Sequence, residues 1–179
     1  FNSVEEKIGT ADILINNAGT SDPKRFKDLD EESWNYVLNT NLNGAYRVAK
    51  NFTDQLIKSK KSGSIVNIAS ILGLRVGFNL SSYATAKAGL IQLTKSMALE
   101  LARSNIRVNA IAPGYILTEI NDDFFATKEG QDYINNIPMR RLGLESDLDG
   151  ILLLLASDAS SFMTGSIIPV DGGHLNNPL

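Results

Sequence analysis

Short hydrophobic runs alternate along the chain with longer segments in which hydrophobic residues recur every three or four positions. The runs occupy residues 11–15, 65–69, 106–112 and 166–170, and small or polar residues follow each of them. Continuous hydrophobic runs of this length are typical of strands that are covered on both faces of a sheet. The alternation predicts an α/β fold built on a parallel sheet, with right-handed crossovers between its strands.

The segment between the first two runs predicts one long helix. It begins at Asp30 or Ser33, and its hydrophobic residues keep a spacing of three and four as far as residue 56. Asn41 falls on the inward stripe of this helix, where a buried amide must find hydrogen-bond partners. Gly44 weakens the helix nearby and predicts a kink or a close contact.

Weaker patterns complete the expected order of elements. The chain opens in the tail of a helix that ends at Gly9, and a second long helix runs from residue 83 to about residue 103. Residues 115–145 have no clear period, and a stretch of this length between a strand and a helix is often a functional lid. Ser146 is expected to cap the last helix, which carries residues 151–156.

Length, charge and composition narrow the class of protein. The 179 residues fit one domain, and no linker or internal repeat divides them. A net charge of −3 with mixed signs indicates neither a nucleic-acid surface nor a polybasic membrane patch. The absence of cysteine excludes a Cys-type zinc site, and the single histidine excludes a metal cluster built on several histidines. No hydrophobic run approaches the roughly 20 residues of a membrane span. We therefore expect a soluble, cytoplasmic protein.

The most informative stretch joins the second strand to the helix that follows it. Ser70 stands where the strand ends, which is where open α/β sheets bind their ligands. Tyr83 and Lys87 are four residues apart, so they share one face of the helix. A free phenol, with a pKa of about 10, is a poor acid–base group at neutral pH, but a nearby cation lowers that pKa. The spacing favours acid–base chemistry, although Tyr-x-x-x-Lys alone more often marks two surface residues.

The first strand also ends in residues suited to ligand binding. Asn16, Asn17, Ala18 and Gly19 are small or carry amides, and small residues at a strand end let a ligand approach the backbone closely. A plain turn is the alternative interpretation, and this segment alone does not separate the two.

These motifs occur together in one known family. The chain resembles the short-chain dehydrogenases and reductases over essentially its whole length, in particular the 3-oxoacyl-carrier-protein reductases and the sugar-acid dehydrogenases. Extended epimerase-like relatives share Tyr-x-x-x-Lys but do not usually carry the NNAG and C-terminal DGG patterns together. The resemblance rests on the order and spacing of NNAG at 16–19, Asn41 in NTNLNG, Ser70, Tyr83 with Lys87, APG at 112–114, Thr118, and TGSIIPVDGG at 164–173.

The resemblance implies a Rossmann-type doubly wound sheet, of which this chain would hold the family's strands 4 to 7. It also implies that a secondary alcohol and a ketone are interconverted with NAD or NADP. Tyr83 would be the general acid in reduction and the base in oxidation, while Lys87 would lower its pKa and hydrogen-bond the nicotinamide ribose. Ser70 would hydrogen-bond the substrate oxygen, and Asn41 would hold a water in a proton relay.

The same resemblance implies a cofactor site on the loops that follow the strands. The cofactor carries the hydride, and the protein supplies orientation and electrostatics. Asn17, Ala18 and Gly19 would lie along the adenosine side. The residues expected to line the nicotinamide are Pro113, Gly114, Ile116 and Thr118.

Two helices suggest self-association. The segments at 31–60 and 82–103 carry hydrophobic residues beyond one narrow stripe. Four small residues in the second segment would permit a close approach of another helix, namely Ala84, Ala86, Ala88 and Gly89. Together with the resemblance, these features predict a homo-oligomer, either a tetramer or a dimer.

The chain departs from the family at its beginning. Family members open with a Gly-rich turn that seats the pyrophosphate on a helix N-terminus, and no such turn occurs here. The residue that separates NAD from NADP use would lie in the same block. We therefore expect residues 1–179 to form a single, N-terminally incomplete domain in which residues 13–16 form an exposed edge. The alternative to an enzyme is a non-catalytic oligomerisation or binding fragment of the same family.

Several other residues have more than one interpretation. His174, the single histidine, is interpreted as a surface or interface residue rather than a catalyst, and Asp171 as a turn residue. The pair at 140–141 consists of arginines, which could bind an anionic substrate group or form a solvated edge of the lid. The phenylalanines at 124–125 could close on a substrate or pack the lid.

Overall fold

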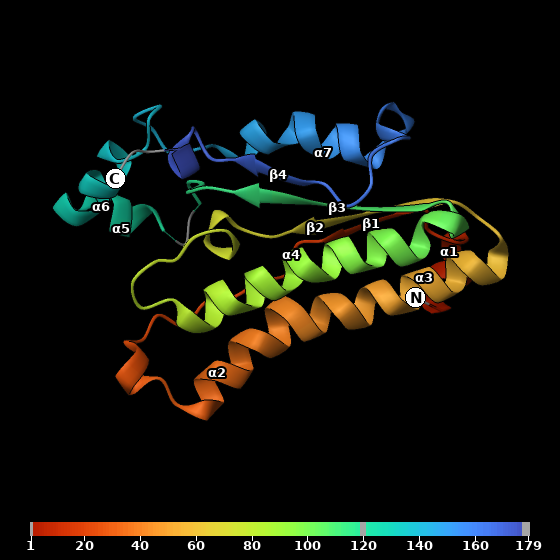
Figure 1. The fold of residues 1–179 in the computed structure, drawn as a ribbon, viewed down its shortest axis with the longest axis horizontal. Coiled ribbons are helices and arrows are strands. Elements are labelled where there is room, and N and C mark those ends of the chain that lie inside the picture. The colour runs from red at the N-terminus through yellow and green to blue at the C-terminus, as the bar shows by residue number, and fades with distance from the viewer. Residues whose placement is uncertain (1, 119–120, 177–179) are drawn as a thin grey trace.

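A parallel sheet of four strands forms the centre of the molecule (Figure 1). The computed structural model describes residues 2–118 and 121–176. The strands lie side by side in chain order and all run in the same direction. They are β1 (Ile13–Asn16), β2 (Gly63–Ile68), β3 (Ile106–Pro113) and β4 (Ile167–Val170).

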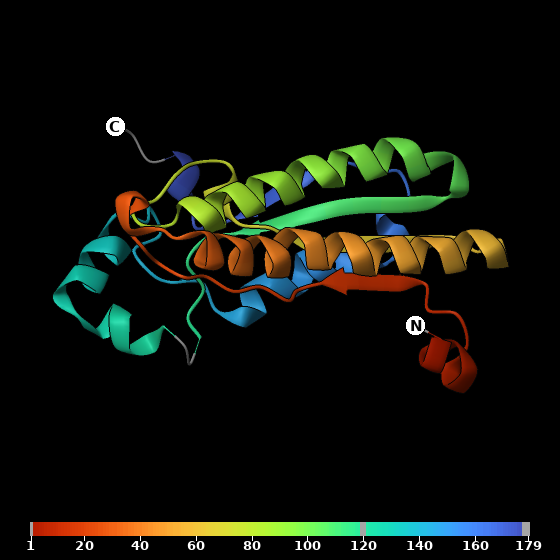
Figure 2. The same cartoon turned by 90° about the horizontal axis from the view of Figure 1, so that it is seen from below.

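Helices cover both faces of this sheet, as expected for a doubly wound fold. Successive side chains of a strand point to opposite faces, and Ile65 belongs to the core beneath α3 (Ala45–Ser59) and α4 (Ser81–Leu101). Its neighbour Val66 packs instead against Leu155 of α7 (Asp149–Ala156). Figures 1 and 2 show α3 and α4 together on one face of the sheet and α7 on the other.

The last crossover differs in hand from the other two. Each crossover steps to the next strand in the same direction, but α3 and α4 pass over one face and α7 over the other. The first two are right-handed and the connection through α7 is left-handed, so the prediction of right-handed crossovers throughout is wrong for the last one. The right-handed preference arises where a twisted strand feeds directly into its helix, whereas residues 114–148 intervene here.

The first long helix contains a π-helical turn. Asp30 caps α2 (Glu31–Leu38) and accepts a hydrogen bond from the Ser33 amide at 2.7 Å. The backbone then widens into a π-helical turn, Asn39–Gly44, before α3 continues. A Cβ at Gly44 would lie 3.2 Å from the Asn39 carbonyl oxygen, which confirms the predicted close contact. Single π turns inside helices are frequently found at functional sites.

Shorter elements complete the chain. The prediction that Ser146 caps the last helix is wrong, because it lies inside a 3₁₀ turn and the Asp147 carboxylate accepts from the Leu144 amide at 2.7 Å. None of the described helices has the length and hydrophobicity that crossing a bilayer requires. The remaining helices are α1 (Asn2–Ile8), α5 (Asp122–Ala126) and α6 (Lys128–Asn135). The 3₁₀ turns are Phe26–Asp28, Ile71–Gly73, Ala102–Ser104, Glu145–Leu148, Asp158–Ser160 and His174–Asn176.

One face of β1 is uncovered. Ile13 and Ile15 are 45% and 42% exposed, while Leu14 packs into the core under α3 and α4. The prediction that this strand is covered on both faces is therefore wrong in the described structure. Ile15 pairs with Val66, so it points to the face of the sheet that carries α7, and α7 lies against β2 and β3.

A chain of buried polar side chains crosses the middle of the sheet. The Asn16 amide donates to the Asn67 side-chain oxygen at 2.9 Å, and the Asn67 amide donates to the Thr94 hydroxyl at 2.8 Å. The Thr94 hydroxyl in turn donates to the Leu90 carbonyl at 2.8 Å. This chain links β1, β2 and α4 just before the strands end, so it fixes the loops that follow.

We expect Asn67→Ala to lower the free energy of unfolding by about 2 to 4 kcal/mol, because it leaves a cavity and removes the acceptor of the Asn16 amide. Asn35→Ala, at an exposed position of α2, is the matched control and should change that free energy by less than about 0.5 kcal/mol. Urea unfolding of the full-length protein measures both. Equal losses in the two variants would contradict a role for the polar chain.

Candidate active site

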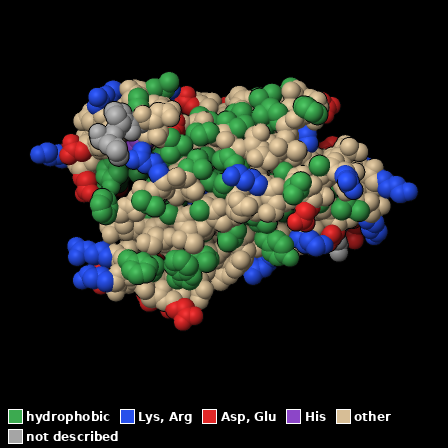
Figure 3. Space-filling view, viewed as in Figure 1, with side chains coloured by type: hydrophobic (Ala, Val, Ile, Leu, Met, Phe, Trp, Pro, Cys, Tyr) green, Lys and Arg blue, Asp and Glu red, His purple; other side chains and the backbone are tan. Residues whose placement is uncertain are grey.

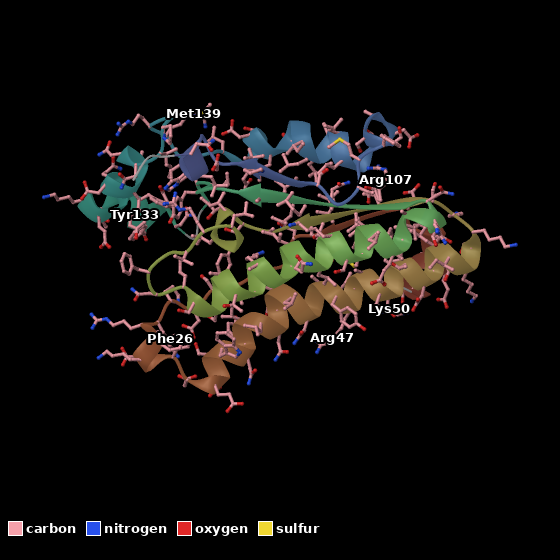
Figure 4. All side chains as sticks on the ribbon, viewed as in Figure 1. Phe26, Arg47, Lys50, Arg107, Tyr133 and Met139 are labelled. Carbon is pink, nitrogen blue, oxygen red and sulfur yellow. The ribbon has the colours of Figure 1, made fainter. Side chains whose placement is uncertain are left out.

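The loops that follow the four strands lie along one edge of the sheet. Parallel strands in register place residues 16–19, 68–70, 112–114 and 170–173 at this edge. Each set contains residues that the sequence singled out, so the structure brings all four groups of predicted site residues to the same side of the molecule. Figure 4 shows Tyr133, in α6, close to this edge, and Arg107 at the opposite end of the sheet.

Lys87 is a buried cation at the centre of this edge. Its side chain is 3% exposed, and its ammonium donates to the Ile68 carbonyl at 2.7 Å. Burial lowers the pKa of Lys87 from 10.5 to about 8. No carboxylate of the described residues forms a salt bridge with it, so the site holds a positive charge without a protein counter-charge.

Tyr83 lies beside Lys87, and its phenol is next to the Ser70 side chain. The Lys87 ammonium is 5.6 Å from the centre of the Tyr83 ring. Burial raises the pKa of Tyr83, and the hydrogen bond with the Ser70 side chain lowers it by less. The expectation that Lys87 lowers the pKa of this phenol is therefore not met here. The physical reason is geometric: the ammonium is directed at the Ile68 carbonyl rather than at the phenol oxygen.

Ser70 is held rigidly at the end of β2. Its hydroxyl oxygen accepts from the Leu72 amide at 3.1 Å and so caps the turn Ile71–Gly73. The residue is buried, and its side chain lies next to the phenol of Tyr83. Both hydroxyl groups, from a strand end and a helix start, are thereby brought together as the spacing predicted.

Asn41 lies in the π-helical turn and ties it to the loop after β1. Its amide nitrogen donates to the carbonyls of Thr20 and Val37 at 2.7 and 2.9 Å. Its side-chain oxygen accepts from the Thr20 amide at 3.3 Å. Both amide hydrogens are thus engaged with protein atoms, which satisfies this buried side chain as the sequence required.

Gly19 lets the loop after β1 lie against the side chains of Asn41 and Lys87. A Cβ there would lie 2.9 Å from the Asn41 side-chain oxygen and 3.5 Å from the Lys87 ammonium. Asn17, Ala18 and Gly19 itself are exposed. The segment is therefore more than a plain turn, because its backbone forms one wall of the edge at which Lys87 is buried.

The loop after β3 lies at the same carboxyl edge of the sheet, on the side away from the β1 loop. Pro113 is buried, and a Cβ at Gly114 would lie 2.8 Å from the Cα of Asp171, so only glycine fits between the ends of β3 and β4. Ile116 pairs through its backbone with Gly143, and the Thr118 amide donates to the side-chain oxygen of Asn121, three residues later, at 2.9 Å.

An aromatic cluster covers this loop, which we call the lid cluster. It consists of Tyr115, Phe124, Phe125 and Tyr133, and the Tyr115 ring lies 5.7 Å from those of Phe125 and Tyr133. The two phenylalanines therefore pack the lid. Tyr115 is not among the residues predicted from the sequence, although its place directly after the strand-ending Pro113-Gly114 is a signal that could have identified it.

The structure also shows the contacts of Arg140, Arg141 and Asp171, whose roles the sequence left open. Arg141 forms an ion pair with Asp147 at 2.6 Å and Arg140 bonds to the Asn135 carbonyl, which favours the lid-edge interpretation for both. Asp171 is a turn residue, as expected, because its carboxylate accepts from the amides of Gly173 and Leu175.

Comparisons with known proteins agree with this geometry. Residues 1–174 match a family model described as enoyl-(acyl carrier protein) reductase. The chain is 40% identical over 170 residues to a 3-oxoacyl-[acyl-carrier-protein] reductase of Thermotoga maritima, covering 95% of this chain and 68% of that reductase. The chain belongs to the short-chain dehydrogenase/reductase family. The family and fold class expected from the motifs are thereby confirmed.

Solved structures of family members superpose closely. A gluconate 5-dehydrogenase from Burkholderia cenocepacia, in complex with NADP and tartrate, gives a TM-score of 0.93 at 32% identity, covering 98% of this chain and 69% of that one. A 4-hydroxyisoleucine dehydrogenase mutant complexed with NADH and succinate gives 0.95 at 34% identity, covering 100% and 74%. The family therefore assigns the chain to the NAD(P)-dependent oxidoreductases, and the chain spans about two thirds of the length of the curated relatives it matches.

We expect Gly19→Ala to lower the free energy of unfolding by about 1 to 3 kcal/mol, because the new methyl group would crowd the Asn41 side chain. Gly150→Ala is the matched control: no atom lies within 4 Å of its Cβ position, and alanine favours its helix by up to about 1 kcal/mol. Urea unfolding of the full-length protein compares them. If both glycines tolerate alanine equally, the packing described for Gly19 is wrong.

Proposed function

We propose that this protein interconverts a secondary alcohol and a ketone, with Tyr83 as the proton donor in reduction and the proton acceptor in oxidation. The observation that carries the proposal is the placement of Tyr83 at the carboxyl edge of the sheet, next to the Ser70 side chain and beside the buried Lys87. A hydroxyl group, a phenol and a desolvated cation are there within reach of one substrate oxygen.

Each residue has a defined part in the reduction. Ser70 donates a hydrogen bond to the carbonyl oxygen of the substrate and orients it. As negative charge develops on that oxygen, Tyr83 transfers its phenolic proton to it, and the alcohol forms. Because burial keeps the pKa of Tyr83 above its usual value, the phenol holds this proton at neutral pH.

NAD or NADP supplies or accepts the hydride when bound. The residues fit such a group at its nicotinamide end, since Lys87 has no carboxylate partner among the described residues and Gly19 leaves the β1 loop without a side chain beside it. We place the ribose at Lys87, the adenosine side along Asn17, Ala18 and Gly19, and the nicotinamide against Pro113, Gly114, Ile116 and Thr118. Asn41 would hold a relay water through its backbone, because its amide hydrogens are already engaged.

Two substrate classes follow from the relatives. The curated ones are reductases of 3-oxoacyl thioesters on a carrier protein, and the solved structures include a gluconate dehydrogenase. Both types of substrate have a carbonyl or secondary alcohol a short distance from a second functional group. The alternative, a non-catalytic binding fragment, is disfavoured because Asn41, Ser70, Tyr83 and Lys87 are all present and in contact with one another or with their shared loops.

We also propose that the protein is a homo-oligomer. Hydrophobic side chains remain exposed on the outer faces of α3 and α4, among them Tyr46, Ile57 and Leu99. In Figure 3 charged side chains gather at the two ends of the molecule and are sparse across the middle of the face in view. Ala86 and Gly89 do not belong to this exposed surface, because Ala86 is fully buried and a Cβ at Gly89 would meet Leu42.

Light scattering at micromolar concentration should show a dimer or tetramer, and a stable monomer would contradict this.

Tyr83→Phe in the full-length enzyme should lower kcat by at least about 100-fold, because general acid catalysis contributes 10²–10⁴-fold. The affinity for NADPH should change less than about threefold, since the ring and its packing remain. Steady-state rates with a panel of ketones and a fluorescence titration with NADPH measure the two effects. A variant with near wild-type kcat would overturn the role of Tyr83.

A further inference from the structure

Arg75 is a cation in the loop that leaves the proposed catalytic serine. The turn Ile71–Gly73 follows Ser70 directly, and the Arg75 amide donates to the Ile71 carbonyl at 2.9 Å. This hydrogen bond folds residues 71–75 into a tight turn, which keeps the Arg75 backbone close to the carboxyl edge of β2. No carboxylate of the described residues forms a salt bridge with this guanidinium.

Two further loops meet Arg75 at this edge. Its guanidinium donates to the His174 carbonyl at 3.0 Å, just after β4. The His174 ring lies 5.6 Å from that of Tyr115, which follows β3. Burial raises the pKa of Tyr115 while the charge of Arg75 draws it down, so the guanidinium and the phenol are within electrostatic range. The loops after three neighbouring strands thus converge on a cation, a phenol and an imidazole.

These groups have hydrogen-bonding capacity that the described protein does not use. A guanidinium has five N–H donors, and the contact with His174 occupies one nitrogen of the Arg75 side chain. The Nδ1 atom of His174 is buried and has no hydrogen-bond partner among the described residues. A simple tether between the two loops would explain the bond to the carbonyl, but not the buried imidazole nitrogen without a partner.

Asp171 does not neutralise the cation. Its two carboxylate oxygens accept from the backbone amides of Gly173 and Leu175 at 2.9 and 2.7 Å. Arg75 is exposed and forms no salt bridge with any described residue, so its guanidinium is available to a ligand. Carboxylates are the organic groups whose geometry matches a guanidinium through two parallel hydrogen bonds.

We propose that Arg75, together with Tyr115 and His174, binds a carboxylate of the substrate, so that the enzyme acts on hydroxy and oxo carboxylic acids. The reacting carbon lies at Ser70 and Tyr83, and the carboxylate reaches the loops after β3 and β4. This inference rests on the proposed function and names its substrate class. A neutral thioester would offer the guanidinium no counter-charge.

The test compares short hydroxy carboxylic acids with their methyl amides as substrates of the full-length enzyme and NADP. Arg75→Gln should lower kcat/KM for the acids by about 10- to 100-fold, because it removes a charge-assisted hydrogen-bonded pair. It should change kcat/KM for the amides by less than about twofold. Arg75→Lys should restore part of the loss, and Arg103→Gln, an exposed arginine in the turn before β3, should alter neither.

A binding measurement separates this inference from the proposed chemistry. Succinate should quench the fluorescence of NADPH bound to the wild-type enzyme, and about 10- to 100-fold more succinate should be needed with Arg75→Gln. His174→Phe, which keeps a ring beside Tyr115, should give a smaller loss. If acids and amides suffer equally in Arg75→Gln, or if the wild type binds no succinate, the carboxylate site is wrong. The proposed function would survive that result, because Tyr83→Phe tests it on the neutral substrates.

Discussion

Lys87 places an ammonium group in the interior, where the Ile68 carbonyl is its hydrogen-bond acceptor and burial lowers its pKa to about 8. A buried charge without a counter-charge costs free energy, and proteins retain such groups mainly where they serve a function. The surrounding structure is arranged to hold it. β2 presents the Ile68 carbonyl, α4 carries the side chain, and Gly19 lets the first loop pass beside it.

This arrangement explains why irregular backbone is concentrated near Lys87. The π-helical turn directs the Asn41 amide at the loop after β1, and the Asn16–Asn67–Thr94 chain fixes the strands on which both loops depend. The π-helical turn and the hydrogen-bonded chain each give buried amide side chains their partners, and they leave the loop backbones open to a ligand. The lid cluster then covers the loop after β3, so the same edge has a charged wall and an aromatic wall.

The sequence predicted the strands and the grouping of Ser70, Tyr83 and Lys87, because both depend on short-range patterns along the chain. The four hydrophobic runs became the four strands, and the spacing from Ser70 through Tyr83 to Lys87 placed these residues together as expected. The left-handed last crossover and the uncovered side of β1 depend on how distant segments pack, which no local period encodes. The same holds for the direction of the Lys87 ammonium, because helical spacing placed it beside Tyr83 but could not reveal the Ile68 carbonyl that it meets.

The burial of the Lys87 charge is tested most directly by the pH dependence of stability. Below pH 8 the folded and unfolded proteins both bind the Lys87 proton, and the cost of burying the charge is present in full. Between pH 8 and 10.5 the folded protein releases this proton and the unfolded protein keeps it, so stability should rise with pH. Relative to Lys87→Met, the free energy of unfolding of the full-length protein should increase by about 3 kcal/mol across this window. A difference between the two proteins that stays constant from pH 7 to 10.5 would contradict the account.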